Sequence, residues 1–467
     1  MSDPHVIGLG ALVVLFVLLA LRMPVALAMV CVGVGGNWAL SQALPYLRFE
    51  PYLAQFKTLL WSNVANYDLS VVPLFVLMGF LASQANLSRD LFQGLAALTA
   101  RVRGGVAMAA IGACAGFGAV CGSSLATAST MGRVALPEMA AQGYAPRLAT
   151  GTLAAGGTLG ILIPPSVALV IYAIIVEASI IEMFQAALIP GLLAVAGFIA
   201  VIWLRLRLDP GLAPEPAPIP APERRAAIAR LVPVLAIFGT IILGLGAGLF
   251  TPTPAAAFGV FVIAAYGVAL RLMGRGGLGL SGLGHALRET AVTAGMIYFI
   301  LFGAEVLKGF FTRTGLPQAL ADWAGASGLD PLMVLALMLL ALILLGCFME
   351  SLAMILVVVP FFWPTLIAMN GGDYATSETA AFGMGPEELK IWFGILALIV
   401  VELGLITPPV GLNVFIIAQL GRGTAHETPM AETFRGVLPF FGVEILRVGL
   451  LLALPVLTLA LPRLLGG

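Results

Sequence analysis

Hydroxyl side chains gather at two places inside long apolar stretches of this sequence. The first is GSSLATAST, which contains Ser123, Ser124 and Thr127, and the second is MESLAM, which contains Glu350 and Ser351. Hydroxyl and backbone carbonyl oxygens can hold a hard monovalent cation, whereas the free N–H groups at helix ends favour an anion. These residue types predict a site for a cation and an anionic small molecule inside an apolar environment.

Each hydroxyl cluster is followed by a phrase with two adjacent prolines. LGILIPPSVAL begins at Leu159, and LGLITPPVGLN begins at Leu403. Proline removes a backbone donor and clashes with the preceding helical turn. In a bilayer, each freed carbonyl must be satisfied by protein, water or an ion. Two broken helices at matching places in two halves of a chain therefore predict the central binding site of a transporter.

The composition explains why these polar groups must be buried. The chain has 467 residues, of which 60% are hydrophobic and 10% charged, and its mean hydropathy is +1.06. A soluble protein carries about 25% charged residues. We therefore predict an all-α polytopic membrane protein whose surroundings are the lipid bilayer. The net charge is zero and the sequence has no basic stripe, so we expect no nucleic-acid partner.

Two apolar stretches, 105–137 and 331–368, are too long for one membrane span and too short for two. Each has a polar centre, so we predict two re-entrant helical hairpins whose tips lie at mid-membrane. The halves match in order, because each tip contains Ser-Leu-Ala and each is followed by a broken helix. With an outer amino terminus, most Lys and Arg residues fall inside. The first hairpin then faces the cytoplasm and the second faces outward, which predicts an inverted repeat of the elevator type.

We predict five regions along the chain. They are N-terminal scaffold helices in 1–69, a first repeat in 70–207, a cytoplasmic Pro-rich linker in 208–230, scaffold helices in 231–289 and a second repeat in 290–467. The first repeat contains an arm helix, the hairpin 105–137, the broken helix 148–180 and a scaffold helix. The second repeat contains the hairpin 331–368, the broken helix 390–420 and a final helix.

The candidate ligands come from the tips and the breaks. For the substrate they are Ser124, Thr127, Thr158, Ser166 and Ser351. For the cation they are Gly122, Ser123, Ser124, Gly157, Thr158 and Pro164 in the first half, with Glu350, Ser351, Thr407, Pro408, Gly411 and Asn413 in the second. The alternative is that the hydroxyls bond back to helix carbonyls and the glycines serve packing.

Several ionisable residues lie inside apolar segments, where they usually line a site or pair with each other. Glu350 stands at the second tip and could coordinate a cation or carry a proton, and Glu402 precedes the second break. Two further couples are spaced for pairing within one helix, and we expect them to be structural. These couples are Glu305 with Lys308 and Glu444 with Arg447.

The sequence lacks the motifs GxxxxGK[ST], HExxH and GxSxG, so we expect neither ATP hydrolysis nor another enzymatic activity. Three readings stay open at this point. The chain could be a subunit of a secondary active importer, a stand-alone symporter of an anion and a cation, or a non-transporting membrane subunit or membrane enzyme.

The phrases GSSLATAST, GGTLGILIPPSVALVIY and FMES with LITPPVGLNVF resemble the large membrane subunit of the tripartite ATP-independent periplasmic (TRAP) transporters, the DctM family. The resemblance runs over nearly the whole chain. It implies an elevator-type fold in a bacterial inner membrane, a small four-helix membrane subunit and a periplasmic solute-binding protein as partners. It also implies coupling to a sodium gradient, no covalent cofactor, and carboxylate substrates such as dicarboxylates, keto acids or sialic acid.

By position, the resemblance implies that the family's tip serines fall on Ser123, Ser124 and Ser351. Its broken-helix ligands fall on 158–165 and 407–413. The sequence departs from the family pattern in having Glu350 where aspartate is frequent, and in the length of its acidic loop at 369–389. Both departures bear on ion selectivity and on the docking of a binding protein.

Overall fold

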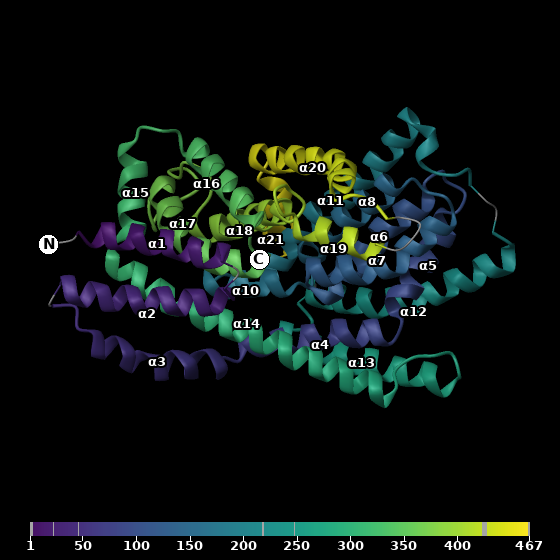
Figure 1. Cartoon of the computed structure of the whole chain (residues 1–467), viewed down its shortest axis with the longest axis horizontal. Helices are drawn as coiled ribbons and strands as arrows, with labels where there is room; N and C mark the ends of the chain where they lie inside the picture. The colour runs from purple at the N-terminus through teal and green to yellow at the C-terminus, as the bar shows by residue number, and fades with distance from the viewer. Residues whose placement is uncertain are drawn as a thin grey trace.

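The structure is a computed structural model that describes residues 3–21, 23–44, 46–216, 219–246, 248–422 and 427–465. All regular secondary structure in these ranges is helical, as predicted. Figure 1 shows that helices distant in the sequence lie side by side, since α2 (Val25–Ala43) packs along α14 (Leu280–Thr314). The fold therefore depends on contacts between the two halves of the chain.

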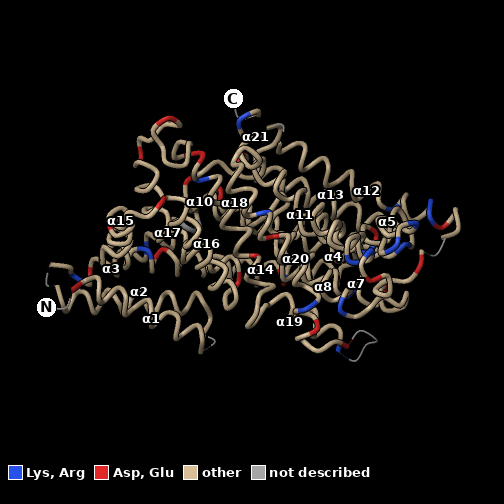
Figure 2. Tube along the Cα trace, turned by 90° about the horizontal axis from the view of Figure 1, so that it is seen from above, with Lys and Arg blue, Asp and Glu red and all other residues tan. Residues whose placement is uncertain are grey.

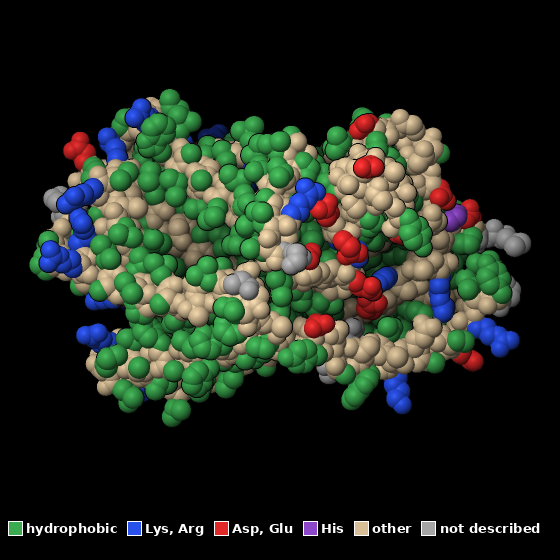
Figure 3. Space-filling model, turned by 180° about the vertical axis from the view of Figure 1, so that it is seen from behind, with side chains coloured by type: hydrophobic (Ala, Val, Ile, Leu, Met, Phe, Trp, Pro, Cys, Tyr) green, Lys and Arg blue, Asp and Glu red, His purple; other side chains and the backbone are tan. Residues whose placement is uncertain are grey.

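Long apolar helices confirm the prediction of a polytopic membrane protein. Within the described residues, seven helices are long and apolar enough to cross a membrane. They are α2, α11 (Ile180–Leu208), α12 (Ala221–Gly246), α13 (Pro252–Leu272), α14, α17 (Ser351–Asn370) and α20 (Met430–Ala453). Figure 3 shows hydrophobic side chains over most of one face, as expected of a surface in contact with lipid.

Basic residues gather at one end of the molecule. Figure 2 shows Lys and Arg clustered around α5 (Leu87–Thr99), α7 (Ser124–Ala141) and α12, and few charges along most other helices. The cluster contains arginines that the charge asymmetry predicts to be cytoplasmic, among them Arg89, Arg101 and Arg230. This end of the molecule is the one that we expect to face the cytoplasm.

Two helix–turn–helix hairpins occur where the sequence predicts them. The first pairs α6 (Gly105–Cys121) with α7, and the second pairs α16 (Pro331–Gly346) with α17. Gly122 turns the first tip with φ +61°, a conformation that favours glycine, and the Ser123 side chain accepts a hydrogen bond from the backbone of Ala126. Their re-entrant depth stays a prediction.

Both proline phrases interrupt helices, as predicted. In the first half, α8 (Pro146–Gly157) and α9 (Leu159–Leu162) are separated from α10 (Val167–Ile175) by a bend of 45°. In the second half, the break lies between α18 (Pro386–Gly404) and α19 (Leu412–Gly421). The Pro164–Pro165 and Pro408–Pro409 peptide bonds are both cis.

The helix–helix contacts of the first half of the chain have counterparts in the second half. Helix α6 packs on α8, as α16 packs on α18, and α8 meets α20, as α18 meets α11. The second arm of each hairpin reaches the opposite half, because α7 packs on α19 and α17 packs on α10. Helices before the hairpins follow the same pattern, with α2 on α14 and α13 on α4 (Val71–Gln84). This is the contact pattern of an internal repeat.

The remaining helices are α1 (Pro4–Ala20), α3 (Phe49–Val64), α15 (Leu316–Ala326) and α21 (Val456–Leu465), with short 3₁₀ turns at Asp68–Ser70 and Pro210–Leu212. The regions predicted from hydropathy need two corrections. The predicted boundaries at 230 and 290 fall inside α12 and α14, because polar turns extend both helices beyond their apolar parts. Residues 217–218 of the predicted linker lie outside the described residues.

Pairs of glycines bring each hairpin against its broken helix. A Cβ on Gly118 would lie 2.4 Å from the Cα of Gly160, and one on Gly404 would lie 2.5 Å from the Cα of Gly346. Gly160 and Gly404 follow the leucines that begin the matched proline phrases. Small residues allow helix backbones to approach this closely inside a membrane. Each half therefore uses a glycine pair to seat its tip next to its break.

These contacts predict that Gly118→Ala destabilises the protein. The added methyl group has no room against backbone atoms, so we expect the free energy of unfolding to fall by about 1–3 kcal/mol. Thermal unfolding of the purified protein in detergent measures the effect. Gly239→Ala on α12 is the matched control, because its Cβ would meet no atom within 4 Å. A midpoint for Gly118→Ala equal to that of the control would contradict the prediction.

Candidate functional site

The two hairpin tips meet on a single carboxylate. Ser124 Oγ, at the first tip, donates a hydrogen bond to Glu402 Oε2 at 2.5 Å. Ser351 Oγ, at the second tip, donates to Glu402 Oε1 at 2.7 Å. All three residues are at most 2% exposed. Serines more than two hundred positions apart in the sequence thus share one buried acceptor.

Glu402 lies in the last turn of α18, directly before the phrase that begins at Leu403. The corresponding position of the first half is Thr158, so the acid occurs in one half only. The carboxylates of Glu350 and Glu444 lie near enough to act on Glu402 electrostatically. The sequence alone marks Glu402 as an intramembrane acid, and the predicted site residues do not include it. Its place next to a proline phrase was the signal that could have identified it.

A second polar group lies where the first tip meets the first broken helix. A Cβ on Gly160 would lie 2.7 Å from Thr127 Oγ1 and 3.0 Å from the Ser123 carbonyl oxygen, and a Cβ on Gly157 would lie 2.9 Å from Asn413 Nδ2. Thr127 Oγ1 and Asn413 Oδ1 are buried and have no hydrogen-bond partner in the described part of the chain. Thr127 Oγ1 thus faces the open backbone at Gly160 in α9, and the side-chain amide of Asn413 lies beside Gly157 at the end of α8.

Asn413 belongs to a different neighbourhood from the one predicted. Its position in the sequence predicts a place among the ligands of the second half, but its Nδ2 donates to the carbonyl oxygen of Ala154 in α8, at 3.4 Å. The physical reason is the crossing of the halves, in which α19 packs on both α7 and α8. A residue that follows the second break in sequence therefore completes the polar group of the first half.

The prolines of the second break are more exposed than those of the first. Thr407 Oγ1 donates to the Leu403 carbonyl at 2.6 Å, so this hydroxyl satisfies its own helix. Gly411 has φ +58° and begins α19, which explains the glycine at this position. Pro408 is exposed, whereas Pro164 at the corresponding place in the first break is buried.

Three predicted residues make local contacts instead of lining the polar groups. Thr158 Oγ1 donates to the Ala155 carbonyl at 2.7 Å. Ser166 caps α10, where its side chain accepts from the backbone of Leu169 at 3.5 Å. Gly122 forms the tip itself. At Thr158, the structure matches the alternative in which a hydroxyl bonds back to its helix.

Two intrahelical ion pairs confirm the predicted structural couples. Glu444 and Arg447 pair on α20 with both side chains 3% exposed, and Arg447 Nη1 also donates to the Pro190 carbonyl of α11 at 2.9 Å. Glu305 and Lys308 lie 4.0 Å apart on α14 and are partly exposed. The first pair joins two helices inside the protein, whereas the second is an open, loose contact.

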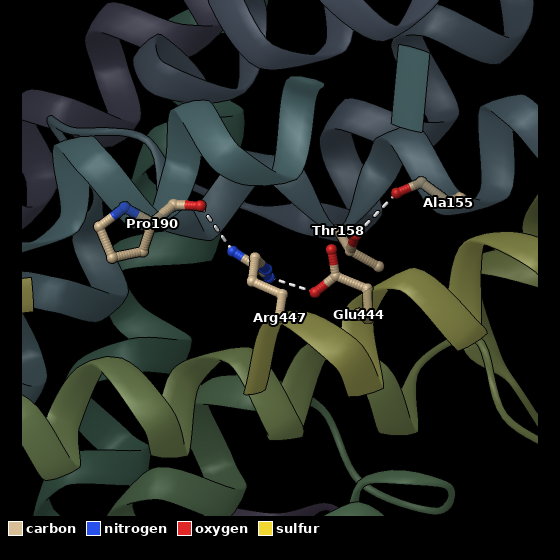
Figure 4. Close-up of polar contacts among 5 residues, drawn as sticks. All are labelled: Ala155, Thr158, Pro190, Glu444 and Arg447. Atoms are coloured by element: carbon tan, nitrogen blue, oxygen red, sulfur yellow. Dashed lines mark hydrogen bonds and ion pairs between the residues drawn. The ribbon is translucent and has the colours of Figure 1, made fainter. Parts of the chain in front are cut away.

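The buried pair lies beside the first broken helix. Figure 4 shows Glu444 between Arg447 and Thr158, with its second oxygen directed toward the side of Thr158. That oxygen and Arg447 Nε have no hydrogen-bond partner in the described part of the chain. The Glu444 carboxylate of this pair also lies near enough to the Glu402 carboxylate to act on it electrostatically.

The architecture is that of helical membrane transporters. The crystal structure of the YdaH transporter of Alcanivorax borkumensis superimposes with a TM-score of 0.59 and 17% identity, over 86% of this chain and 88% of that one. The structure of MtrF of Neisseria gonorrhoeae gives a TM-score of 0.50 and 16% identity, over 86% of this chain and 83% of that one. At these identities the likeness establishes the fold alone.

Sequence comparison identifies the family. The model of the DctM component of the tripartite ATP-independent periplasmic transporters matches residues 12–457. The chain is 33% identical to the C4-dicarboxylate TRAP transporter large permease protein DctM of Pseudomonas aeruginosa, over 91% of this chain and 94% of the relative. This chain belongs to the DctM family, and it is a multi-pass protein of a bacterial inner membrane.

Relatives named for other substrates match almost as broadly. The sialic acid TRAP transporter large permease protein SiaM of Vibrio cholerae is 31% identical over 87% of this chain and 88% of that protein. The isethionate TRAP transporter permease protein DctMQ of Oleidesulfovibrio alaskensis is 26% identical over 80% of this chain and 55% of the longer relative. Relatives at similar levels of identity are thus named for different substrates.

The buried ion pair predicts that a single substitution lowers the free energy of unfolding much more than a double substitution does. Arg447→Met leaves the Glu444 carboxylate buried without its cation, and we expect the free energy of unfolding to fall by about 3–5 kcal/mol. The double variant Glu444→Gln with Arg447→Met removes both charges and is expected to recover most of that loss. Thermal unfolding in detergent compares the two proteins. A double variant no more stable than Arg447→Met would contradict the interpretation.

Proposed function

We propose that this chain is the large membrane subunit of a secondary active importer of an organic acid anion. The observation that carries the proposal is the pair of tip hydroxyls on Ser124 and Ser351, which together donate to one carboxylate. A carboxylate of the substrate offers the same pair of acceptor oxygens. Relatives named for C4-dicarboxylates, sialic acid and isethionate support an organic acid as the transported class.

We assign the coupling ion, sodium, to the polar group between the first tip and the first broken helix. Its ligands are oxygens of Thr127, Ser123 and Asn413, next to the open backbone at Gly157 and Gly160. The assignment fits because two of these oxygens are buried without a partner, and buried acceptors need one. Sodium is a transported ion here, so this group has to bind it on one side of the membrane and release it on the other.

Coupling follows from differential affinity. The sodium ion must favour the substrate-competent arrangement of the tips over the empty one, and substrate must favour sodium binding to the same extent. The hairpins and broken helices are the parts that we expect to move together, since they share the polar groups. Helices such as α2, α13 and α14 are expected to form the scaffold against which they slide.

We propose two protein partners, a small four-helix membrane subunit and a periplasmic solute-binding protein that delivers the anion. The family description names a tripartite and periplasmic system. The match covers 55% of the DctMQ relative, so that permease has additional sequence outside the matched part. The chain releases its substrate unchanged in this proposal and is not an enzyme. Co-purification of a small membrane protein with the tagged chain tests the first partner.

The tip assignment predicts that Ser351→Ala impairs transport. Loss of one hydrogen bond to a charged carboxylate, about 1.5–3 kcal/mol, should lower substrate affinity about tenfold or more. The measurement is uptake of labelled succinate, sialic acid and isethionate by vesicles that contain the assembled system under a sodium gradient. Ser41→Ala is the control, because Ser41 bonds only to its own helix at Trp38. Unchanged affinity and rate for the transported anion would rule out this role for Ser351.

The sodium assignment predicts a separate effect of Thr127→Val. The substitution keeps the side-chain shape and removes one oxygen ligand, so the sodium concentration for half-maximal uptake should rise about tenfold. Uptake at saturating substrate is measured against sodium concentration. Thr240→Val is the matched control, because Thr240 bonds back to Ala236 on α12. A sodium dependence identical in Thr127→Val and the control would show that the ion binds elsewhere.

A further inference from the structure

The carboxylate of Glu402 occupies the position that the proposed function gives to the substrate. Both tip hydroxyls donate to it, one to each oxygen, and its exposure is 1%. Two buried donors on separate hairpins need an acceptor whenever no substrate is present, because an unsatisfied buried hydroxyl is costly. A bidentate carboxylate supplies both acceptors and holds the hairpins together.

We propose that Glu402 is a built-in substitute for the substrate carboxylate, which closes the two tips in the empty transporter. This inference rests on the proposed function and extends it to the unloaded half of the transport cycle. The asymmetry of the repeat supports it. Thr158, at the matching position of the first half, bonds to Ala155 in its own helix, so one acid serves both tips.

Substrate and Glu402 cannot hold the same two hydroxyls at once. When an anionic substrate displaces Glu402, the freed carboxylate faces two further acids, Glu350 and Glu444, which lie near it. The guanidinium of Arg447 is engaged with Glu444 and the Pro190 carbonyl. Repulsion from the two acids opposes the displacement of Glu402, so the substrate has to compete with this carboxylate for the two hydroxyls.

The substitute has a kinetic consequence. Net uptake requires the empty transporter to return from its inward-facing to its outward-facing conformation. The proposed contact closes the tips for that step. Exchange of internal for external substrate does not include this step, because the transporter is loaded in both directions. A residue that serves only the empty form therefore affects net uptake and leaves exchange intact, whereas a residue needed for folding or for the loaded form affects both.

Glu402→Gln tests the inference, because the neutral amide cannot accept the two charge-assisted hydrogen bonds that the carboxylate accepts, one on each oxygen. Sodium-driven net uptake and exchange are measured in the same vesicles with the complete transport system and with whichever of succinate, sialic acid or isethionate the unmodified protein transports. We expect net uptake to fall about tenfold, exchange to stay within about twofold of the unmodified protein, and the KM for substrate to decrease, as loss of a competing charge-assisted contact requires. Glu305→Gln is the control, since it removes an intramembrane carboxylate outside the site.

Equal loss of net uptake and exchange in Glu402→Gln would overturn the inference, and so would unchanged rates of both. If this variant does not accumulate in the membrane, Glu402→Asp replaces it. Aspartate keeps the charge but is one carbon–carbon bond shorter, so it cannot reach both serines, and the same separation of net uptake from exchange is expected. Absence of both processes in the unmodified protein would instead contradict the proposed function itself, and the inference with it.

Discussion

Polar groups inside a membrane protein must find their partners within the protein, because lipid offers none. The bridge from Ser124 and Ser351 to Glu402 is the clearest instance of this constraint here. Each tip serine donates to a carboxylate that lies outside its own hairpin. The hydrogen bonds from the two tip serines to Glu402 therefore connect the two halves, and the candidate site lies where these residues meet.

Close packing makes this meeting possible. Glycines at Gly118 and Gly160, and at Gly346 and Gly404, allow backbone contact between each hairpin and its broken helix. Larger residues there would move the tips away from the breaks, and a serine hydroxyl acts only within hydrogen-bond distance. The second arms of the hairpins then cross to the opposite half, as the packing of α7 on α19 and of α17 on α10 shows. The glycines thus fix position, and the serines supply chemistry.

Much of this arrangement could be predicted from the sequence, because prolines and polar clusters are conspicuous in apolar surroundings. The hairpins, both breaks and the structural pairs with Arg447 and Lys308 follow from local pattern alone. The grouping of Asn413 with the first half could not be predicted, since it depends on how α19 crosses α8. The position of Glu402 between both tips also depends on tertiary contact. Hydropathy likewise placed boundaries inside α12 and α14, because it registers apolar length and not helix length.

A repeat with two equal halves would bind two equal ligands, whereas the symport that we propose requires an anion and a cation to bind differently. Here the halves differ at the residue that precedes each proline phrase, with Thr158 in one and Glu402 in the other. The threonine hydroxyl donates to a carbonyl of its own helix, whereas the glutamate side chain accepts hydrogen bonds from both tips. The first half thereby keeps uncharged, unpaired oxygens on Thr127 and Asn413, which suit a cation. In the function that we propose, this difference between Thr158 and Glu402 assigns the cation to the first half and the carboxylate-binding hydroxyls to the two tips.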